Sequence, residues 1–439
     1  MINCFIPFLS LPQARQTVRA LGLCDRIKNI YLLATEKIPD EVEGCEMLMI
    51  DSPASTATFR TIALHADTAY TLLYTKYTAF ELGQFAFERL LAIAGDTNAG
   101  MLYADRYLLK NGNSQQAPVI DYQKGSLRDD FDFGSLLFFR SSVLKQAVRA
   151  MDADYRFAGL YDLRLRVSEL AELVHVNEYL YSEVETDIRK SGEKLFDYVD
   201  PKNRAVQIEM EAVCTAYLKR VGGYLAPDFE PVTFDAGGFE QEASVIIPVR
   251  NRIRTIEDAI RSVLAQKTTF RFNLIIVDNH STDGTSEAIE KYTADGRVVH
   301  LVPERSDLGI GGCWNVGVHH PACGKFAVQL DSDDVYSGPD TLQKIVDAFY
   351  EQNCAMVVGT YRMTDFKMNE IPPGIIDHRE WTLENGRNNA LRINGLGAPR
   401  AFYTPVLRRI NLPNTSYGED YALGLRISRT WRIGRIYDV

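Results

Sequence analysis

The sequence predicts an α/β protein with two tandem domains of one kind, each a mainly parallel sheet flanked by helices. Three observations support this prediction. Short apolar runs alternate with helical patterns over residues 243–439. The same order of runs recurs in weaker form over residues 1–222. A stretch at 223–242, rich in proline, glycine and acidic residues and without periodicity, separates the two and is expected to be a linker.

The composition and net charge of the chain argue against a nucleic-acid-binding function. The chain has 439 residues, of which 46% are hydrophobic and 24% charged, as in ordinary soluble globular proteins. Its formal net charge is -10. Proteins that bind nucleic acid neutralise phosphates with basic residues, so we expect no nucleic-acid partner.

Cysteine usage and apolar runs predict a cytoplasmic location. The seven cysteines are dispersed and form no C-x-x-C pair, which argues against a disulfide framework or a zinc site and favours a reducing compartment. No apolar run approaches the roughly 20 residues that span a bilayer. We therefore expect no transmembrane segment, while peripheral membrane association and a homo-oligomer both stay open.

The elements of the C-terminal half follow one another as strand and helix. Residues 206–221 have helical spacing, and Gly222-Gly223 can end that helix before the linker. Beyond it, buried strands are expected at 243–248, 273–277, 298–302 and 325–330, with helices at 254–266 and from 285 to about 292. Buried strands joined by helices indicate a parallel sheet with right-handed crossovers, which binds ligands at the carboxyl ends of its strands.

The N-terminal half repeats this order in four short matches. The matched runs, first copy before second, are 5–7 with 246–248, 30–33 with 274–277, 70–73 with 327–330, and 163–168 with 423–428. Because the order is kept throughout, we expect an internal duplication.

The strongest chemical signal is a group of acids at 331–334. Asp331, Asp333 and Asp334 follow an apolar strand. Crowded carboxylates raise one another's pKa unless a cation neutralises them, and hard oxygen ligands favour Mg or Mn. Acids at a helix or turn start are the plain structural alternative. An EF-hand loop does not fit, because its twelfth position is Leu342.

A phosphatase signature is the main competitor for these acids. Residues from Asp331 to Val335 match the D-x-D-x-V pattern of haloacid-dehalogenase phosphatases. That pattern normally opens its fold, whereas three expected strands precede it here.

Three further segments could serve a site or could be plain structure. Asp278 ends an expected strand and could accept a hydrogen bond from a ring N–H such as N3 of uracil, or it could belong to an ordinary turn. The glycines around Asn315, at 309–317, would let a nucleotide approach the backbone, or they form a loop into a helix. Glu419 and Asp420 open a helix, where they could act as a general base or complement the helix dipole.

Taken together, these residues resemble the family 2 glycosyltransferases of the glycosyltransferase-A fold. The resemblance covers residues 243–439, and its ordered pieces are 244–251, Ile256 with 262–266, 275–279, 281–285, Asn315 with Gly317, 330–334 and 418–420. It implies an inverting enzyme that moves a sugar from a nucleotide-diphosphate donor, with UDP as the expected nucleotide, to a hydroxyl of a glycan or lipid-linked acceptor. A divalent Mn or Mg ion would assist.

The resemblance also implies roles for single residues. Those assigned to the donor are Pro248, Val249, Arg250, Asn251, Asp278, Asn315, Asp331 and Ser332. Asp333 would bind the metal together with Asp331 and Asp334. Asp420, beside Glu419, would deprotonate the acceptor hydroxyl. His378, Trp381 and Arg400 are candidates for contact with the acceptor sugar.

The sequence departs from the family pattern in two places. The family often has Ala-Arg-Asn where this chain has Cys313-Trp314-Asn315, which leaves donor contacts there open. The chain also ends at Val439, inside the last expected strand, so a truncated and inactive catalytic domain is one expectation.

The N-terminal copy lacks the chemical residues. Lys76 stands within the run that replaces 331–334, Gly159-Leu160 replaces Glu419-Asp420, and Ala34 replaces Asp278. We therefore predict a degenerate, non-catalytic domain that serves docking, acceptor binding or dimerisation. A carbohydrate-binding protein with two inactive domains is a third hypothesis, against which stand the acids retained in the second copy.

Overall fold

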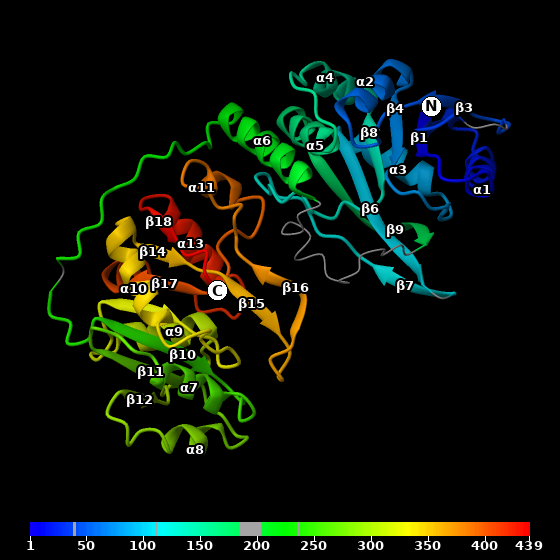
Figure 1. The fold of residues 1–439 in the computed structure, drawn as a ribbon. Helices are drawn as coiled ribbons and strands as arrows, with labels where there is room; N and C mark the ends of the chain where they lie inside the picture. The colour runs from blue at the N-terminus through cyan, green and yellow to red at the C-terminus, as the bar shows by residue number, and fades with distance from the viewer. Residues whose placement is uncertain (38–40, 111, 185–202, 236) are drawn as a thin grey trace. The chain divides into compact units, whose positions relative to one another are not determined.

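The chain divides into two units. The computed structural model describes residues 1–37, 41–110, 112–184, 203–235 and 237–439. The units are Met1–Tyr224 and Leu225–Val439 (Figure 1). Each contains a twisted sheet with helices on its faces.

The first unit carries its strands and helices in mixed order. Its strands are β1 (Ile2–Pro7), β2 (Ile27–Ala34), β3 (Glu46–Met49), β4 (Tyr70–Tyr74), β5 (Phe80–Leu82), β6 (Met101–Lys110), β7 (Asn113–Ala117), β8 (Leu136–Arg140) and β9 (Leu173–Val184). Its helices are α1 (Leu11–Leu21), α2 (Thr56–His65), α3 (Ala86–Thr97), α4 (Ser141–Arg149), α5 (Gly159–Leu170) and α6 (Arg204–Arg220).

Two apolar cores cover the two faces of the first sheet. The strand order is β3-β2-β1-β4-β8-β6-β9-β5, with β7 paired to β6. Side chains alternate along β1, so Cys4 and Ile6 join the core under α1 and α3, while Phe5 joins the core under α2, α4 and α5. A strand buried on both faces explains why the run at 2–7 is apolar throughout.

The second unit is built from the predicted alternation. Its strands are β10 (Ala243–Val249), β11 (Phe272–Asp278), β12 (Val298–Leu301), β13 (Phe326–Gln329), β14 (Met356–Val358), β15 (Tyr361–Thr364), β16 (Glu370–Ile376), β17 (Arg400–Tyr403) and β18 (Ile433–Arg435). Its helices are α7 (Ile256–Leu264), α8 (Thr285–Glu290), α9 (Ile310–His319), α10 (Thr341–Gln352), α11 (Gly386–Asn389), α12 (Thr404–Ile410) and α13 (Glu419–Ser428).

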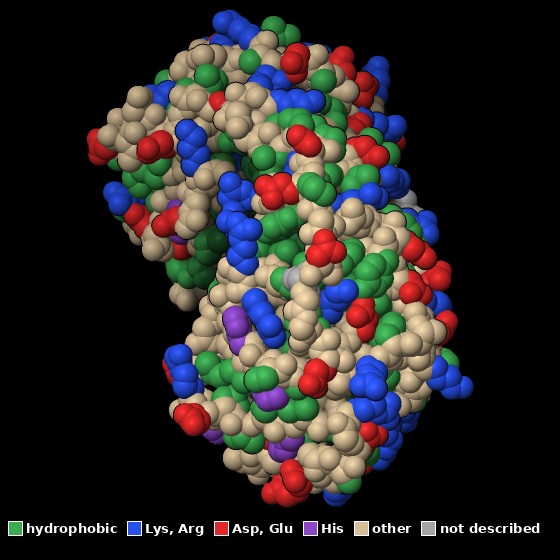
Figure 2. All heavy atoms as spheres, turned by 90° about the vertical axis from the view of Figure 1, so that its left-hand side faces the viewer, with side chains coloured by type: hydrophobic (Ala, Val, Ile, Leu, Met, Phe, Trp, Pro, Cys, Tyr) green, Lys and Arg blue, Asp and Glu red, His purple; other side chains and the backbone are tan. Residues whose placement is uncertain are grey.

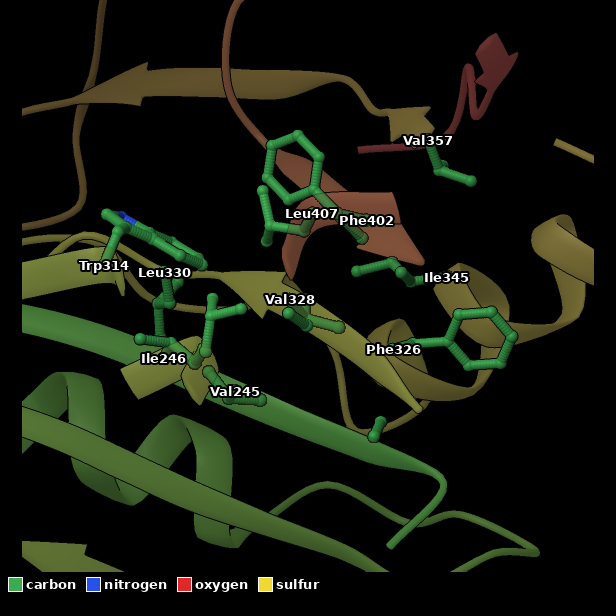
Figure 3. Close-up of a cluster of buried hydrophobic side chains, with 14 of the residues drawn as sticks. Val245, Ile246, Trp314, Phe326, Val328, Leu330, Ile345, Val357, Phe402 and Leu407 are labelled. Carbon is green, nitrogen blue, oxygen red and sulfur yellow. The ribbon is translucent and has the colours of Figure 1, made fainter. Parts of the chain in front are cut away.

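The second sheet brings the predicted site residues to one edge. Its order is β12-β11-β10-β13-β17-β14-β18, and β15 pairs with β16 separately. Strands β10, β11 and β13 are parallel neighbours, so their carboxyl ends, at Val249, Asp278 and Gln329, lie at the same edge. The core beneath includes Trp314, Leu330 and Phe402, which Figure 3 shows among buried apolar side chains.

The two sheets share one topology. Strands β3, β2, β1, β4, β8, β6 and β9 correspond in order to β12, β11, β10, β13, β17, β14 and β18. The pairings also agree: β4–β8 and β13–β17 are antiparallel, whereas β6–β9 and β14–β18 are parallel. All four short matches fall on corresponding elements, the last on α5 and α13. The predicted fold class is confirmed.

The stretch expected to be a linker contacts the second unit. Asn388 accepts a hydrogen bond from the backbone N of Leu225 at 2.9 Å, and Arg387 donates to the carbonyl of Asp228 at 2.7 Å. Glu230 forms a parallel bridge with Trp431. These contacts explain why the second unit begins at Leu225 rather than at the first strand.

The surface is mixed in charge. On the face that Figure 2 shows, acidic and basic side chains lie interspersed. Within the described residues, no helix combines the length and the apolar character needed to cross a membrane.

Candidate functional site

A chain of polar contacts joins the acids of the second unit. Gln329 donates from Nε2 to Oδ1 of Asp331 at 3.0 Å. Arg400 donates from Nε to Oε1 of Gln329 at 2.7 Å, and its Nη2 lies 2.5 Å from Oδ2 of Asp420. Asp331, just beyond β13, and Asp420, in the first turn of α13, are therefore linked through the side chains of Gln329 and Arg400.

Strand pairing explains why these residues meet. Strands β13 and β17 are antiparallel with Val328 opposite Ala401, so the end of β13 at Gln329 lies beside the start of β17 at Arg400. The side chain of Arg400 is nearly buried, and its Nη1 donates to the carbonyl of Leu396 at 3.0 Å. The guanidinium group is thus fixed in orientation before it reaches Asp420.

The acids at 331–334 are crowded, as predicted. Desolvation, together with the charges of Asp331 and Asp333, raises the pKa of Asp334 to about 7. Ser332 is buried, while Asp333 and Asp334 are exposed. Arg252 lies 3.8 Å from Asp333 and offsets part of the negative charge. Acids that raise one another's pKa in this way would gain from a bound cation.

The donor set fits a divalent ion that takes further ligands from elsewhere. Within the described ranges, no group of three or more His, Cys, Asp or Glu side chains is arranged to hold a metal ion alone. Asp331 and Asp333 nevertheless act electrostatically on Asp334, and carboxylate oxygens of this kind suit Mn or Mg. A cation here would need ligand oxygens from a bound molecule.

Glu419 differs from its neighbour Asp420. The Glu419 side chain is buried, and its Oε2 has no hydrogen-bond partner. Desolvation, followed by the charges of Asp420 and Asp331, raises the pKa of Glu419. The Asp420 side chain is about one-third exposed. Asp420 is therefore the better placed of the two to receive a proton from a bound molecule.

Glycine at 311 makes room for the backbone of Pro413, close to Glu419. A Cβ atom at Gly311 would lie 2.0 Å from the carbonyl oxygen of Pro413 and 3.1 Å from Cβ of Glu419. The sequence suggested close approach of a nucleotide to these glycines, whereas the structure has α9 packed against the segment before α13.

Asp278 organises the loop after β11. It is fully buried and accepts hydrogen bonds from the backbone N of Ser281 at 3.0 Å and from the hydroxyl of Ser286. Desolvation would raise the pKa of Asp278, but the hydrogen bonds from Ser281 and Ser286 outweigh it and lower the pKa. Contact of this carboxylate with a nucleotide base stays a prediction.

The remaining donor candidates lie in the loop after β10. Pro248 is partly exposed, Val249 is buried in the core, and Arg250 and Asn251 are exposed. Asn251 ties this loop to the loop after β11, because its backbone N donates to Ser281 Oγ at 2.9 Å and its Oδ1 accepts from the backbone N of Thr282 at 2.8 Å.

Asn315 has backbone partners in the structure. Its Nδ2 donates to the carbonyl of Leu412, and its Oδ1 accepts from the backbone N of Leu412, at 2.8 and 2.9 Å. Trp314 beside it packs edge-on against Phe402 in the core (Figure 3). Both residues hold the segment that leads to α13, and donor contact by Asn315 stays a prediction.

The three acceptor candidates are all buried. His378 hydrogen-bonds the carbonyl of Ala398 at 3.2 Å, and Trp381 packs within the core against Gly386. Arg400 is bound to Asp420. The structure thus gives His378 and Trp381 interior positions without a surface from which to contact a sugar.

Burial of His378 predicts a pH-dependent stability. Desolvation, followed by the charge of Arg435, lowers the pKa of His378 to about 4. The unfolded chain binds this proton below about pH 6.5, so the stability contributed by neutral His378 is complete above that pH. As the pH falls from 6.5 to 4, this contribution is lost, and the free energy of unfolding decreases by about 3 kcal/mol. In His378→Gln this part of the loss should vanish.

Urea unfolding at several pH values, followed by tryptophan fluorescence, measures this effect. The three tryptophans, Trp314, Trp381 and Trp431, all lie in the second unit, so the signal reports that unit. The exposed His319→Gln is the control and should keep the wild-type slope. Equal slopes for His378→Gln and wild type would contradict the prediction.

Sequence reasoning missed Gln329 and the role of Arg400. Gln329 interrupts the otherwise apolar run from Phe326 to Leu330, and a polar residue in a buried strand was the available signal. No local pattern indicates that its partner is Arg400, which lies 71 residues away in the sequence.

Comparison with known proteins relates the second unit to one family. Residues 244–409 match the family model described as glycosyl transferase family 2. A putative teichuronic acid biosynthesis glycosyltransferase, TuaG of Bacillus subtilis, is 33% identical over 120 residues, which cover 27% of this chain and 46% of TuaG. An uncharacterized glycosyltransferase of Rickettsia felis is 30% identical over 200 residues, covering 45% of this chain and 32% of that protein. The chain thus spans less than half the length of these relatives.

Among solved structures, S. aureus TarS 1-349 in complex with UDP-GlcNAc is 24% identical, with a TM-score of 0.38, over 45% of this chain and 56% of that one. A mannosyltransferase from Pyrobaculum calidifontis in complex with GDP-Man and Mn2+ is 18% identical, with a TM-score of 0.35, over 53% and 66%. The family match spans β10 to α12 and includes the acids at 331–334. Over residues 244–409 the chain is therefore similar to glycosyl transferase family 2.

Proposed function

We propose that the second unit transfers a sugar from a nucleotide-diphosphate donor to a hydroxyl of a glycan or lipid-linked acceptor, with inversion at the anomeric carbon. UDP is the proposed nucleotide. The observation that carries the proposal is the contact chain from Asp331 through Gln329 and Arg400 to Asp420. This chain of contacts fixes Asp420, a carboxylate that can accept a proton, relative to Asp331, one of the acids that could bind a metal ion and, through it, a diphosphate.

The proposed chemistry assigns one task to each acid. Asp420 accepts the proton of the acceptor hydroxyl as its oxygen bonds to the anomeric carbon. The bond from that carbon to the diphosphate oxygen breaks, and the nucleoside diphosphate leaves. Arg400 keeps Asp420 oriented for this transfer. Asp333, with Asp331 and Asp334, would hold a divalent cation, which neutralises charge on the departing diphosphate.

The phosphatase alternative has less support. Its nucleophile would be Asp331, which follows β13, the fourth strand of the unit along the chain. The match of residues 244–409 to a glycosyltransferase family covers the same acids. A phosphatase would also leave Asp420 and its bond to Arg400 without a task.

We propose that the first unit does not catalyse transfer. Lys76 occupies the region of the missing acids and is paired with buried Glu183 at 2.6 Å, so a positive charge stands where the second unit has its acids. At Gly159, the counterpart of Glu419, a Cβ would lie 2.5 to 2.6 Å from backbone atoms of Ala54, Ser55 and Thr56. An acid in the position of Glu419 would therefore collide with backbone at the start of α5.

Donor binding tests the proposed function. Calorimetric titration of the full chain with UDP, GDP and their sugar conjugates should show one nucleotide that binds more tightly with Mn. Asp333→Asn should weaken that binding at least about tenfold. The exposed Asp258→Asn, on α7, is the matched control and should bind as wild type does.

Two results would overturn this proposal. If no nucleotide binds with or without Mn, the donor assignment fails. If one binds but Asp333→Asn changes neither its affinity nor its dependence on Mn, the metal assignment fails.

A further inference from the structure

The first unit contains a cavity that the proposed transfer reaction does not use. Its volume is about 370 Å³, which is within the range of small-molecule sites. It is lined by Ala54, Thr75, Met101, the segment 129–134, Leu137, Phe139, Phe157, Leu160, Tyr161, Arg164 and Met210. All of these residues belong to one unit.

The cavity lies at the counterpart of the site in the second unit. Thr75 follows β4 as Asp331 lies just beyond β13. Gly134 lies just before β8, and the segment 377–399 lies just before β17, the strand that corresponds to β8. Leu160 is the second residue of α5, as Asp420 is the second residue of α13. The shared topology has therefore kept a hollow at the same end of the sheet, although the acids of the second unit are absent from it.

The lining offers aromatic rings. Phe131 and Phe133 lie with ring centroids 4.5 Å apart, and Phe139, Phe157 and Tyr161 also line the wall. Phe131 and Phe157 are partly exposed, whereas Phe133 and Tyr161 are buried. Aromatic faces of this kind pack against the C–H faces of a ring-shaped ligand.

The charges of the lining are balanced. Asp130 pairs with Arg128, and Asp132 pairs with Arg106, both at 2.8 to 2.9 Å. Asp129 acts electrostatically on Arg164, whose guanidinium lies over the rings of Tyr161 and Phe133, at 4.9 and 5.3 Å. Among the described residues, each carboxylate of the lining therefore lies near a cation, which does not favour a nucleotide phosphate or a metal ion as the ligand.

We propose that this cavity is a binding site for a neutral saccharide. Carboxylates accept hydrogen bonds from sugar hydroxyls, and aromatic rings cover the apolar face of a pyranose, so the lining supplies both kinds of contact. The volume admits one or two sugar rings. The first unit would then bind a carbohydrate in the cavity that corresponds to the site of the second unit. This proposal does not depend on whether the second unit transfers a sugar.

Ligand-observed NMR on the full chain tests this site. The probes are glucose, galactose, mannose and N-acetylglucosamine, with inorganic pyrophosphate as the anionic comparison. At least one neutral sugar should bind, at about millimolar strength. Phe131→Ala, at the partly exposed rim, should weaken binding about fivefold. Asp129→Asn is a second variant in case the first folds poorly. Phe85→Ala is the matched control, because Phe85 is exposed and does not line the cavity.

The outcomes separate this proposal from the proposed function. Weakening in Phe131→Ala or Asp129→Asn but not in Phe85→Ala supports the saccharide site. If none of the four sugars binds at 50 mM, chosen as about fifty times the expected dissociation constant, the proposal is overturned. It is equally overturned if pyrophosphate binds in their place. Sugar binding that survives both cavity variants but is lost in Asp420→Asn would belong to the second unit and would also refute it.

Discussion

Asp420→Asn is expected to lower turnover by a factor of about 100 to 10,000 while leaving donor binding unchanged. The amide keeps the size of the side chain but cannot take a proton from the acceptor. Asp420 lies at the start of α13, about one-third exposed and held by Arg400, so the loss should fall on the chemical step. Transfer rates under saturating donor, with donor affinity measured separately, provide the check.

Glu419→Gln is the matched control for that experiment. Glu419 is buried, and its pKa is raised by desolvation and by the neighbouring acids, so a neutral amide should replace it with a much smaller effect. If Glu419→Gln abolishes turnover and Asp420→Asn does not, the roles of the two residues are reversed. If neither lowers it, the base lies elsewhere.

Arg400→Met should lower both stability and turnover. The change removes the hydrogen bonds to Gln329 and Leu396 and the ion pair with Asp420. The arginine side chain that makes these contacts is nearly buried. We expect a loss of about 3 kcal/mol in the free energy of unfolding of the second unit. Turnover should fall about tenfold, because Asp420 loses its fixed orientation.

Three variants separate these effects. Arg400→Lys keeps the charge but cannot make all the contacts of a guanidinium, so it should restore part of the turnover. Gln329→Leu breaks the link to Asp331 and leaves the ion pair to Asp420 in place. The exposed Arg426→Met is the control for loss of positive charge. Wild-type turnover in a stably folded Arg400→Met would refute the positioning role.

Local patterns were enough to predict most of the fold of the second unit. Apolar runs at 243–248 and 273–277 became β10 and β11 because both strands are buried on both faces and need no polar alternation. The position of the antiparallel strand β17 was not predicted, because its four residues at 400–403 carry little periodic signal. Its pairing beside β13 is decided by tertiary packing.

The candidate site was predictable where chemistry is local in the sequence. Three acids within 331–334 indicate mutual repulsion without any structure. The task of Arg400 was not predictable, because a lone arginine in a loop-like stretch carries no sign of the carboxylate that it contacts 20 residues later. Burial of His378 and Trp381 depends on how the segment before β17 folds back on the core, which their neighbours in sequence do not determine.

The packing at Gly159 has a consequence for how the first unit can evolve. In the second unit Gly311 on α9 leaves space for the backbone of Pro413, and position 419 on α13 carries the acid. In the first unit the glycine stands on α5 itself and leaves space for the backbone at Ala54–Thr56. Backbone cannot turn aside as a side chain can, so a single substitution that restores the acid at 159 meets a fixed obstacle. A single substitution therefore does not restore the acid pair. The first unit can diverge toward a new ligand, and this change is not easily reversed.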